Sequence, residues 1–205
     1  MPLQSLINAC GADADHLRAL ATESVSLWEP WLKPLAETHV AGEDPTYNDA
    51  FQQMQHEMNR LSGADTALIC ALAEQVLTTE AKDIRVAVWY CWARLQQDGE
   101  EGFADGLALL AGLLQRFGDA LHPQRARSRE AALGLPASAR ALDTPTPSPE
   151  VTTATAQRTA AALLMIDDVC RPQDGAGLGG LYVSPWASLL RAVGSHVLVS
   201  QLVPA

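Results

Sequence analysis

The stretch LTTEAKDIRVAVWYCWARL, residues 77–95, decides the fold of this 205-residue chain. It begins as a charged turn and continues into a segment whose apolar residues recur at helical spacing. These residues cover nearly the whole circumference of the predicted helix: Ile84, Val86, Ala87, Val88, Trp89, Tyr90, Cys91, Trp92 and Leu95. A helix that is apolar on all sides is normally buried on several of them. We therefore expect a central core helix in which Trp89 and Trp92 are largely buried.

The charged turn before this helix contains Lys82, Asp83 and Arg85. Asp83 is expected to cap the helix or to complement its positive end. Arg85 is expected to pair with a carboxylate from another helix while its aliphatic stem covers Trp89 one turn later. The alternative is that the turn is a patch for binding a partner. Charges near a helix end usually act locally on stability, which favours the structural role.

Four further helices are predicted before residue 123. Each has apolar residues at steps of three and four, and no segment alternates with period two between turn residues. Asp65 or Thr66 is the expected N-cap of the third helix of the chain, and Asp98-Gly99 is expected to separate the core helix from the next one. The predicted segments are 15–28, 51–61, 68–77 and 102–121, the last ending at His122-Pro123. The short connections predict an all-α fold, an antiparallel multi-helix bundle.

A change in composition at LDTPTPSPE, residues 142–150, predicts an extended Pro/Thr/Ser linker. It divides the chain into a helical domain over 1–141 and a C-terminal segment over 151–205. In that segment, a helix, a glycine-rich loop and a second helix starting at Ser184-Pro185 predict a helical hairpin. Because two helices make a poor core alone, the hairpin is expected to dock on the first unit, to pair with another copy, or to begin a further domain.

The charge and the apolar content exclude several classes of partner. The net charge is −10 and the pI is near 4.8, whereas binding to nucleic acid depends on clustered Lys and Arg. No apolar run approaches the roughly 20 residues that span a bilayer, and the N-terminus lacks the basic start and apolar segment of a secretory signal. The sequence therefore predicts a cytoplasmic protein without nucleic-acid binding or direct membrane insertion.

The motifs that suggest a catalytic or metal site lack a required part. HEMNR, residues 56–60, has Arg60 where the H-E-x-x-H zinc motif needs its second histidine. The loop DGAGLGG lacks the Lys-Ser/Thr and the preceding strand of a phosphate loop. Asp167 and Asp168 diverge by about 100° on a helix, and the histidines are scattered. We therefore predict no catalytic, cofactor-binding or metal-binding residues, and no enzymatic activity.

Three blocks of sequence, taken in order, carry a resemblance to a known family. They are AGEDPTYNDAF (41–51), LTTEAKDIRVAVWYCWARL (77–95) and GFADGLALLAGLLQRFGDALHPQ (102–124). The chain resembles, over residues 28–135, the N-terminal domain of TssA-like proteins of the type VI secretion system, often called the ImpA N-terminal domain. The matching features include Gly42, Asp44, Tyr47, Lys82, Asp83, Arg85, Trp89, Asp105, His122 and Pro123.

The resemblance implies a non-enzymatic scaffold that helps baseplate, tube and sheath assemble at the membrane complex, to which it would be recruited in the cytoplasm. Homo-oligomerisation of the chain is also compatible with this role. The candidate structural or interaction residues are Asp44, Lys82, Asp83, Arg85, Trp89, Asp105 and His122. Two alternatives are a helical regulatory adaptor unrelated to secretion and a helical enzyme with a cryptic site around His122 or Cys91. For the enzyme, a nucleophile and a base must lie within hydrogen-bond reach of each other.

Overall fold

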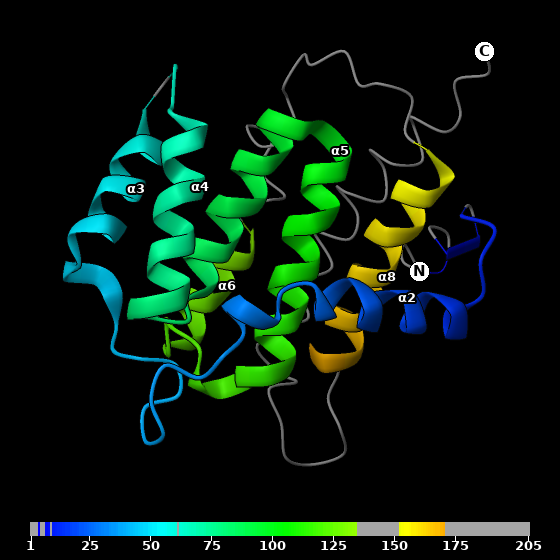
Figure 1. Cartoon of the computed structure of the whole chain (residues 1–205), viewed down its shortest axis with the longest axis horizontal. Helices are drawn as coiled ribbons and strands as arrows, with labels where there is room; N and C mark the ends of the chain where they lie inside the picture. Colours follow the sequence, from blue (N-terminus) through cyan, green and yellow to red (C-terminus); the bar gives the residue numbers. More distant parts are fainter. Residues whose placement is uncertain (1–3, 5–6, 9, 61, 135–151, 171–205) are drawn as a thin grey trace.

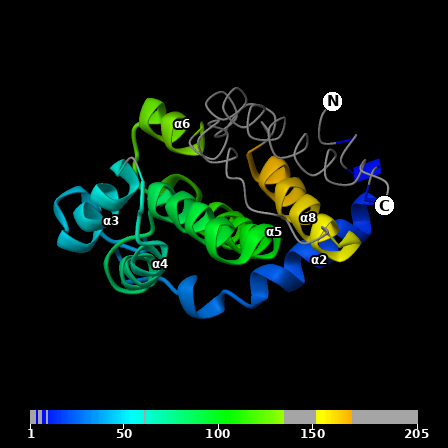
Figure 2. The same cartoon turned by 90° about the horizontal axis from the view of Figure 1, so that it is seen from above.

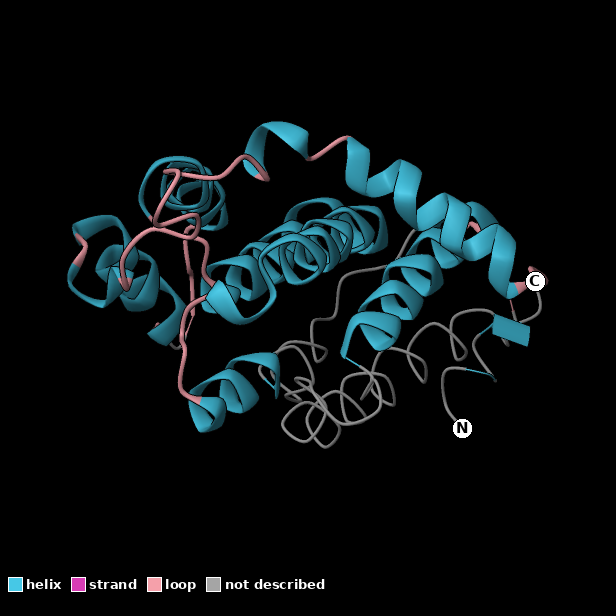
Figure 3. Ribbon diagram, turned by 90° about the horizontal axis from the view of Figure 1, so that it is seen from below, coloured by secondary structure: helices cyan, strands magenta, loops and turns pink. Residues whose placement is uncertain are grey.

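The computed structural model describes residues 4, 7–8, 10–60, 62–134 and 152–170. These residues form helices joined by loops, with no β-strand among them (Figure 1, Figure 3), which confirms the all-α prediction. The main elements are α2 (Ala14–Ser26), η1 (Glu29–Trp31), η2 (Pro45–Tyr47), α3 (Asp49–Asn59), α4 (Thr66–Gln75), η3 (Val76–Glu80), α5 (Ile84–Phe117), η4 (Gly118–Ala120), α6 (Ala126–Gly134) and α8 (Thr153–Cys170).

The long helix α5 is a hairpin of two antiparallel arms, residues 84–98 and 100–117 (Figure 1). Its helical backbone is interrupted at Gly99, which has φ 62° and ψ −143°, so the break predicted at Asp98-Gly99 lies at the observed turn. A Cβ on Gly106 would stand 2.8 Å from Cα of Cys91 on the facing arm. Only a residue without a side chain fits at this contact, which lets the two arms pack closely.

Four helices flank the α5 hairpin on two sides, and α6 packs against it as well (Figure 2). Helix α4 packs on α5 with α3 beyond it, while α2 and α8 pack together on the opposite side. Trp89 in the first arm is buried, as predicted, with 6% of its surface exposed. Trp92 is less deeply buried than Trp89 and packs at the edge of the core. One narrow side of this helix reaches the surface.

Side chains from the preceding loops cap the N-termini of three of these helices. A side-chain oxygen of Asp13 accepts a hydrogen bond from the backbone N–H of His16, Asn48 does the same for Phe51, and Asp65 for Leu68. Each bond satisfies one of the N–H groups that a helix start leaves without an intrahelical partner. The cap predicted at Asp65 is therefore confirmed.

The region after the second arm of α5 differs from the prediction. The helix ends at Phe117 and not at His122-Pro123, because Gly118 adopts φ 47° and its N–H bonds back to the carbonyl of Leu114. The chain then forms the short turn η4 and the helix α6. Neither element was predicted from the sequence. The His122-Pro123 peptide bond is cis.

Helix α8, which follows the predicted linker, packs into the same core as α2 and α5 (Figure 2). Its residues Ala160, Leu163 and Ile166 are fully buried. Of the predicted hairpin, only this first helix lies within the described residues. The linker at 142–150 and the helix after Ser184-Pro185 lie outside them, so the predicted domain boundary stays a prediction. Within the part of the chain that the structure describes, no helix is both long and apolar enough to cross a membrane.

Candidate functional site

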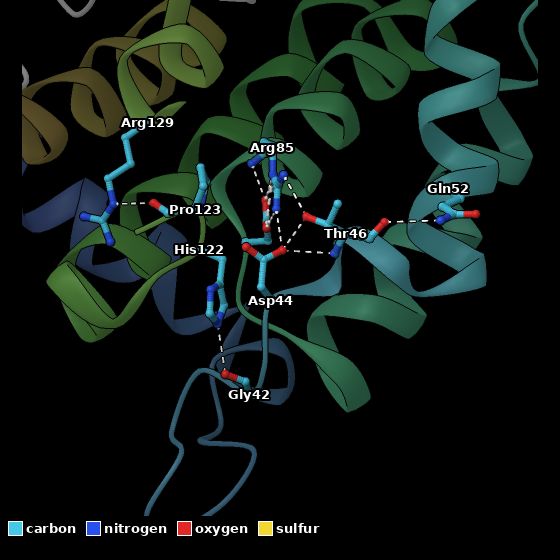
Figure 4. A network of polar contacts seen from close by, with 9 residues as sticks. Gly42, Asp44, Thr46, Gln52, Arg85, His122, Pro123 and Arg129 are labelled. Carbon is cyan, nitrogen blue, oxygen red and sulfur yellow. Dashed lines mark hydrogen bonds and ion pairs between the residues drawn. The ribbon is translucent and has the colours of Figure 1, made fainter. Parts of the chain in front are cut away.

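Three loop segments from the three sequence blocks meet in one polar cluster at the base of α5 (Figure 4). Backbone hydrogen bonds join them: Lys82 N–H donates to the Ala41 carbonyl at 2.8 Å, His122 N–H to the Lys82 carbonyl at 3.0 Å, and Ile84 N–H to the His122 carbonyl at 2.8 Å. We call residues 41–46, 81–85 and 121–123 the polar node. Sequence reasoning identified the blocks separately but did not predict that their loops touch.

The ring of His122 ties the third segment of the polar node to the first. The side chain is buried, and its Nε2 atom lies 2.9 Å from the carbonyl oxygen of Gly42 (Figure 4). Because a carbonyl only accepts, Nε2 carries the proton in this contact. Gly42 itself has φ 69° and lies beside the backbone of Glu80, with which a Cβ would overlap at 2.1 Å. The approach of the two segments therefore requires glycine at this position.

Asp83 and Arg85 form a charged pair at the start of α5. Asp83 is fully buried and is the N-cap of α5, accepting from the Arg85 N–H at 2.7 Å. Its other oxygen lies 2.6 Å from a guanidinium nitrogen of Arg85. The guanidinium also reaches Asp44 at 3.3 Å and lies 4.5 Å from the centre of the Phe51 ring. The guanidinium therefore stacks on Phe51 of α3, whose ring centre lies 5.0 Å from that of Trp89.

Asp44 stands at the outer edge of this pair and is half-exposed. It accepts from the backbone N–H of Thr46 at 3.0 Å and from the Thr46 hydroxyl at 2.5 Å. Partial burial acts to raise the pKa of Asp44, but these hydrogen bonds and the positive charge of Arg85 outweigh it and leave the pKa below its usual range. Asp44 is therefore ionised at neutral pH, so a negative charge stands just before η2.

The negative charge of Asp83 should contribute measurably to the stability of the fold. Asp83→Asn keeps the side-chain shape but removes the charge facing Arg85, and it should lower the free energy of unfolding by about 2 kcal/mol, because buried bonds to charged groups are the stronger ones. Asp44→Asn is the control. It faces the same guanidinium from a half-exposed position and should cost under about 1 kcal/mol. Urea denaturation measures both, and equal losses would mean that Asp83 has no special structural role.

Lys82 is buried inside the fold, which is unusual for a lysine. Its Nζ atom donates to the carbonyl oxygen of Trp31 at 2.7 Å and to that of Leu77 at 2.5 Å, and it lies 5.5 Å from the centre of the Phe117 ring. The two carbonyls belong to the ends of η1 and of the α4–η3 segment, where helices leave acceptors without partners. Lys82 therefore joins these ends to the polar node, and it is not available for surface contacts.

Burial, with a smaller effect of the nearby charge of Arg116, lowers the pKa of Lys82 from its ordinary 10.5 to about 8. The unfolded chain then binds more protons than the folded one between these two values, so this residue's contribution to stability rises with pH in that window. Relative to Lys82→Met, which cannot titrate, the wild-type chain should gain about 1 kcal/mol of unfolding free energy between pH 7 and pH 9. Denaturation of both proteins at the two pH values measures it. A constant difference would contradict the lowered pKa.

Arg129 on α6 was not identified from the sequence, although it supports the third segment of the polar node. This buried guanidinium donates to the carbonyl of Pro123 at 2.7 Å (Figure 4). It also donates to the carbonyls of Asp119, at 2.8 Å, and Leu121. One side chain thus satisfies several carbonyls of the loop that carries His122. The only sequence signal was an arginine following a helix end, which does not by itself indicate burial.

Asp105 and Trp89 lie apart from the polar node. Asp105, in the second arm of α5, pairs with Arg94 on the first arm at 3.0 Å and also with Arg158 on α8. It therefore joins three helical segments. Trp89 lies deeper, with its ring centre 5.0 Å from that of Phe51. Of the seven candidate residues, the structure brings Asp44, Lys82, Asp83, Arg85 and His122 together in the polar node.

His122 and Cys91, the two residues around which an enzymatic site was considered, do not form a nucleophile and base pair. His122 has a backbone carbonyl as the partner of its Nε2 atom. Cys91 is buried between the arms of α5, and burial raises the pKa of its thiol far above the usual range, which disfavours the reactive thiolate. Among the described residues, no group of three or more His, Cys, Asp and Glu is placed to hold a metal ion.

Comparisons with known proteins agree with the arrangement of the three blocks. Residues 32–141, more than half of the chain, match the family described as ImpA, N-terminal, type VI secretion system. The fold is similar to that of the N-terminal domain, including the conserved ImpA_N region, of the TssA component of the type VI secretion system from Burkholderia cenocepacia. That match has a TM-score of 0.52 and 19% sequence identity, and it covers 85% of this chain and 94% of the other.

No curated protein sequence is significantly similar to this chain. The family match spans the loops at 41–46, 81–85 and 121–123 that meet in the polar node, together with both arms of α5. The resemblance seen in the sequence is therefore confirmed: the chain belongs to the ImpA N-terminal family of the type VI secretion system.

Proposed function

We propose that this protein is a non-enzymatic scaffold that helps the baseplate, tube and sheath of a type VI secretion system assemble. The proposal rests on how the buried polar and charged side chains of the fold are bonded. Lys82, Asp83, His122 and Arg129 all bond to backbone atoms or to other parts of the fold. In a family of secretion-system components, residues of this kind support the shape of a binding domain.

The polar node supports a rigid body of the kind that a scaffold needs. It fixes the loops at one end of α5 by hydrogen bonds between segments that lie up to about eighty positions apart, as between His122 and Gly42. Buried, fully bonded polar groups favour one arrangement of the chain over its alternatives. A domain held in one shape presents its outer faces in fixed positions, and this lowers the entropic cost of binding large partners.

The proposed site of action is the cytoplasm, with recruitment to the inner-membrane complex of the secretion system. The proposed role of residues 151–205 is positioning or self-association, so homo-oligomerisation is part of the proposal. Helix α8, the first part of this segment, is docked on α2 and α5, which fixes its place relative to the helical domain.

Co-isolation from the host tests this proposal. The affinity-tagged full chain, produced from its own gene locus, should retain baseplate, tube or sheath subunits identified by mass spectrometry. The untagged wild-type strain, carried through the same procedure, is the control for non-specific retention. A folded chain that retains proteins outside the secretion system, and none of its subunits, would favour the regulatory adaptor instead.

A further inference from the structure

The short turn η2 exposes an aromatic side chain to an unusual degree. Tyr47 has 89% of its surface exposed, and with Leu27 it is one of two large hydrophobic residues exposed in the part of the chain that the structure describes. Exposed tyrosines in fixed positions are typical of binding hot spots, because the ring offers a large contact area at a small entropic cost.

The backbone beneath Tyr47 is held on both sides. Asp44 caps the start of η2, and the Asn48 N–H donates to the Pro45 carbonyl at 2.8 Å. The side-chain amide of Gln52 donates to the Thr46 carbonyl at 3.4 Å (Figure 4). Through Asp44, the turn is connected to Arg85 and so to the buried Asp83. Tyr47 is therefore presented from a rigid part of the polar node and not from a loose loop.

The charge around Tyr47 indicates the chemistry of its partner. The segment 37–51 contains four carboxylates, Glu37, Glu43, Asp44 and Asp49, and no lysine or arginine. Arg85, the cation that reaches this turn from α5, faces two carboxylates, Asp83 and Asp44, so these three groups together keep one negative charge. A neutral partner would bury these carboxylates without compensation, which is costly. A cationic partner would pair with them.

We propose that the exposed residues at and just before η2, Glu43, Asp44, Thr46 and Tyr47, form a docking surface for a positively charged segment of another protein. A lysine or arginine of that segment stacks on the Tyr47 ring as a cation over an aromatic face. Neighbouring basic residues pair with Glu43 and Asp44. A second copy of this chain, with its net charge of −10, is repelled from the same surface at long range.

That the partner is a protein rests on the proposed function, because a scaffold binds other proteins. The first experiment places the photo-crosslinking residue p-benzoylphenylalanine at position 47 of the full chain in the host, with the same residue at Leu27 as the control. Leu27 is also a large exposed hydrophobic residue, 75% exposed at the end of α2. Sequencing the crosslinked peptide by mass spectrometry identifies the segment that contacts each position.

The expected result is a segment rich in Lys and Arg, captured at position 47 and not at position 27. Capture of a neutral or acidic segment, of a second copy of this chain, or of nothing overturns the inference. A basic segment from a protein outside the secretion system contradicts the proposed function but leaves the docking surface standing. The two failures are therefore distinguishable.

A synthetic peptide with the captured sequence then tests the mechanism by fluorescence anisotropy. Tyr47→Phe should keep the affinity within about twofold, whereas Tyr47→Leu should weaken it about fivefold, because only the aromatic ring attracts a cation. Glu43→Lys should weaken binding and its dependence on salt, while Glu23→Lys, on the exposed side of α2, should not. Equal affinities of the Phe and Leu variants would overturn the stacking contact.

Discussion

Replacing Trp89 by alanine should lower the free energy of unfolding by about 3–5 kcal/mol, the usual cost of truncating a large buried aromatic residue. Trp89 is 6% exposed and packs with its ring centre 5.0 Å from that of Phe51. Phe51 in turn supports the Arg85 guanidinium at 4.5 Å. Truncation therefore leaves a cavity beneath the charged pair at the start of α5, and chemical denaturation measures the loss.

Trp92→Ala is the matched control for this prediction. It removes the same side chain three residues later on the same arm, but from a partly buried position at the edge of the core. We expect a smaller loss, roughly half as large, because less apolar area returns to water. A loss below about 1 kcal/mol for Trp89→Ala would mean that α5 is not the centre of the core.

Gly42→Ala should also destabilise the fold by about 3–5 kcal/mol, although it adds only one methyl group. Two effects act together. Alanine at φ 69° costs about 1–2 kcal/mol, and its Cβ would lie 2.1 Å from the carbonyl oxygen of Glu80. The segments must then separate, which weakens the bond from Lys82 N–H to the Ala41 carbonyl and that from His122 to Gly42. Thermal unfolding followed by circular dichroism measures the change.

Gly63→Ala separates these two effects. Gly63 has nearly the same backbone angle, φ 68°, but an added Cβ would meet nothing within 4 Å. It should therefore show only the conformational cost of about 1–2 kcal/mol. If the two alanine variants unfold alike, the close contact between the first and second segments of the polar node is wrong.

The helical core was predictable because its signals are local. The apolar residues of 84–95 repeat at helical spacing on all sides, and the observed helix is buried at the centre of the fold. Asp65 and Asp83 are short acceptors placed just before apolar periodic segments, and both are the N-caps that they were expected to be. A backbone N–H and a side chain two or three residues apart need no long-range information to meet.

The sequence singled out residues of the polar node but could not predict their contacts, because the partners come from distant segments. Nothing local indicates that the ammonium of Lys82 reaches the carbonyl of Trp31, or that α6 brings Arg129 against the carbonyls of residues 119–123. The stacking of the Arg85 guanidinium on Phe51 of α3 has the same origin.

The end of the second arm shows a different limit. Apolar residues continue at helical spacing as far as Leu121, so periodicity extends the predicted helix to that point. The observed helix stops at Phe117 because Gly118 adopts a positive φ, and Leu121 is buried from the following turn. A buried apolar residue at helical spacing is therefore compatible with both a helix and a turn. Gly118 was the better signal for the end of the helix.

The central claim is that this member of the ImpA N-terminal family works as a scaffold for assembling the secretion machine. Its most direct test is to image fluorescently labelled sheath in living host cells with the gene deleted, and again after complementation with the wild-type chain. We predict that sheaths are absent or shortened in the deletion strain and return to normal length on complementation. Sheaths that assemble to full length and contract normally without the gene would contradict the scaffold role.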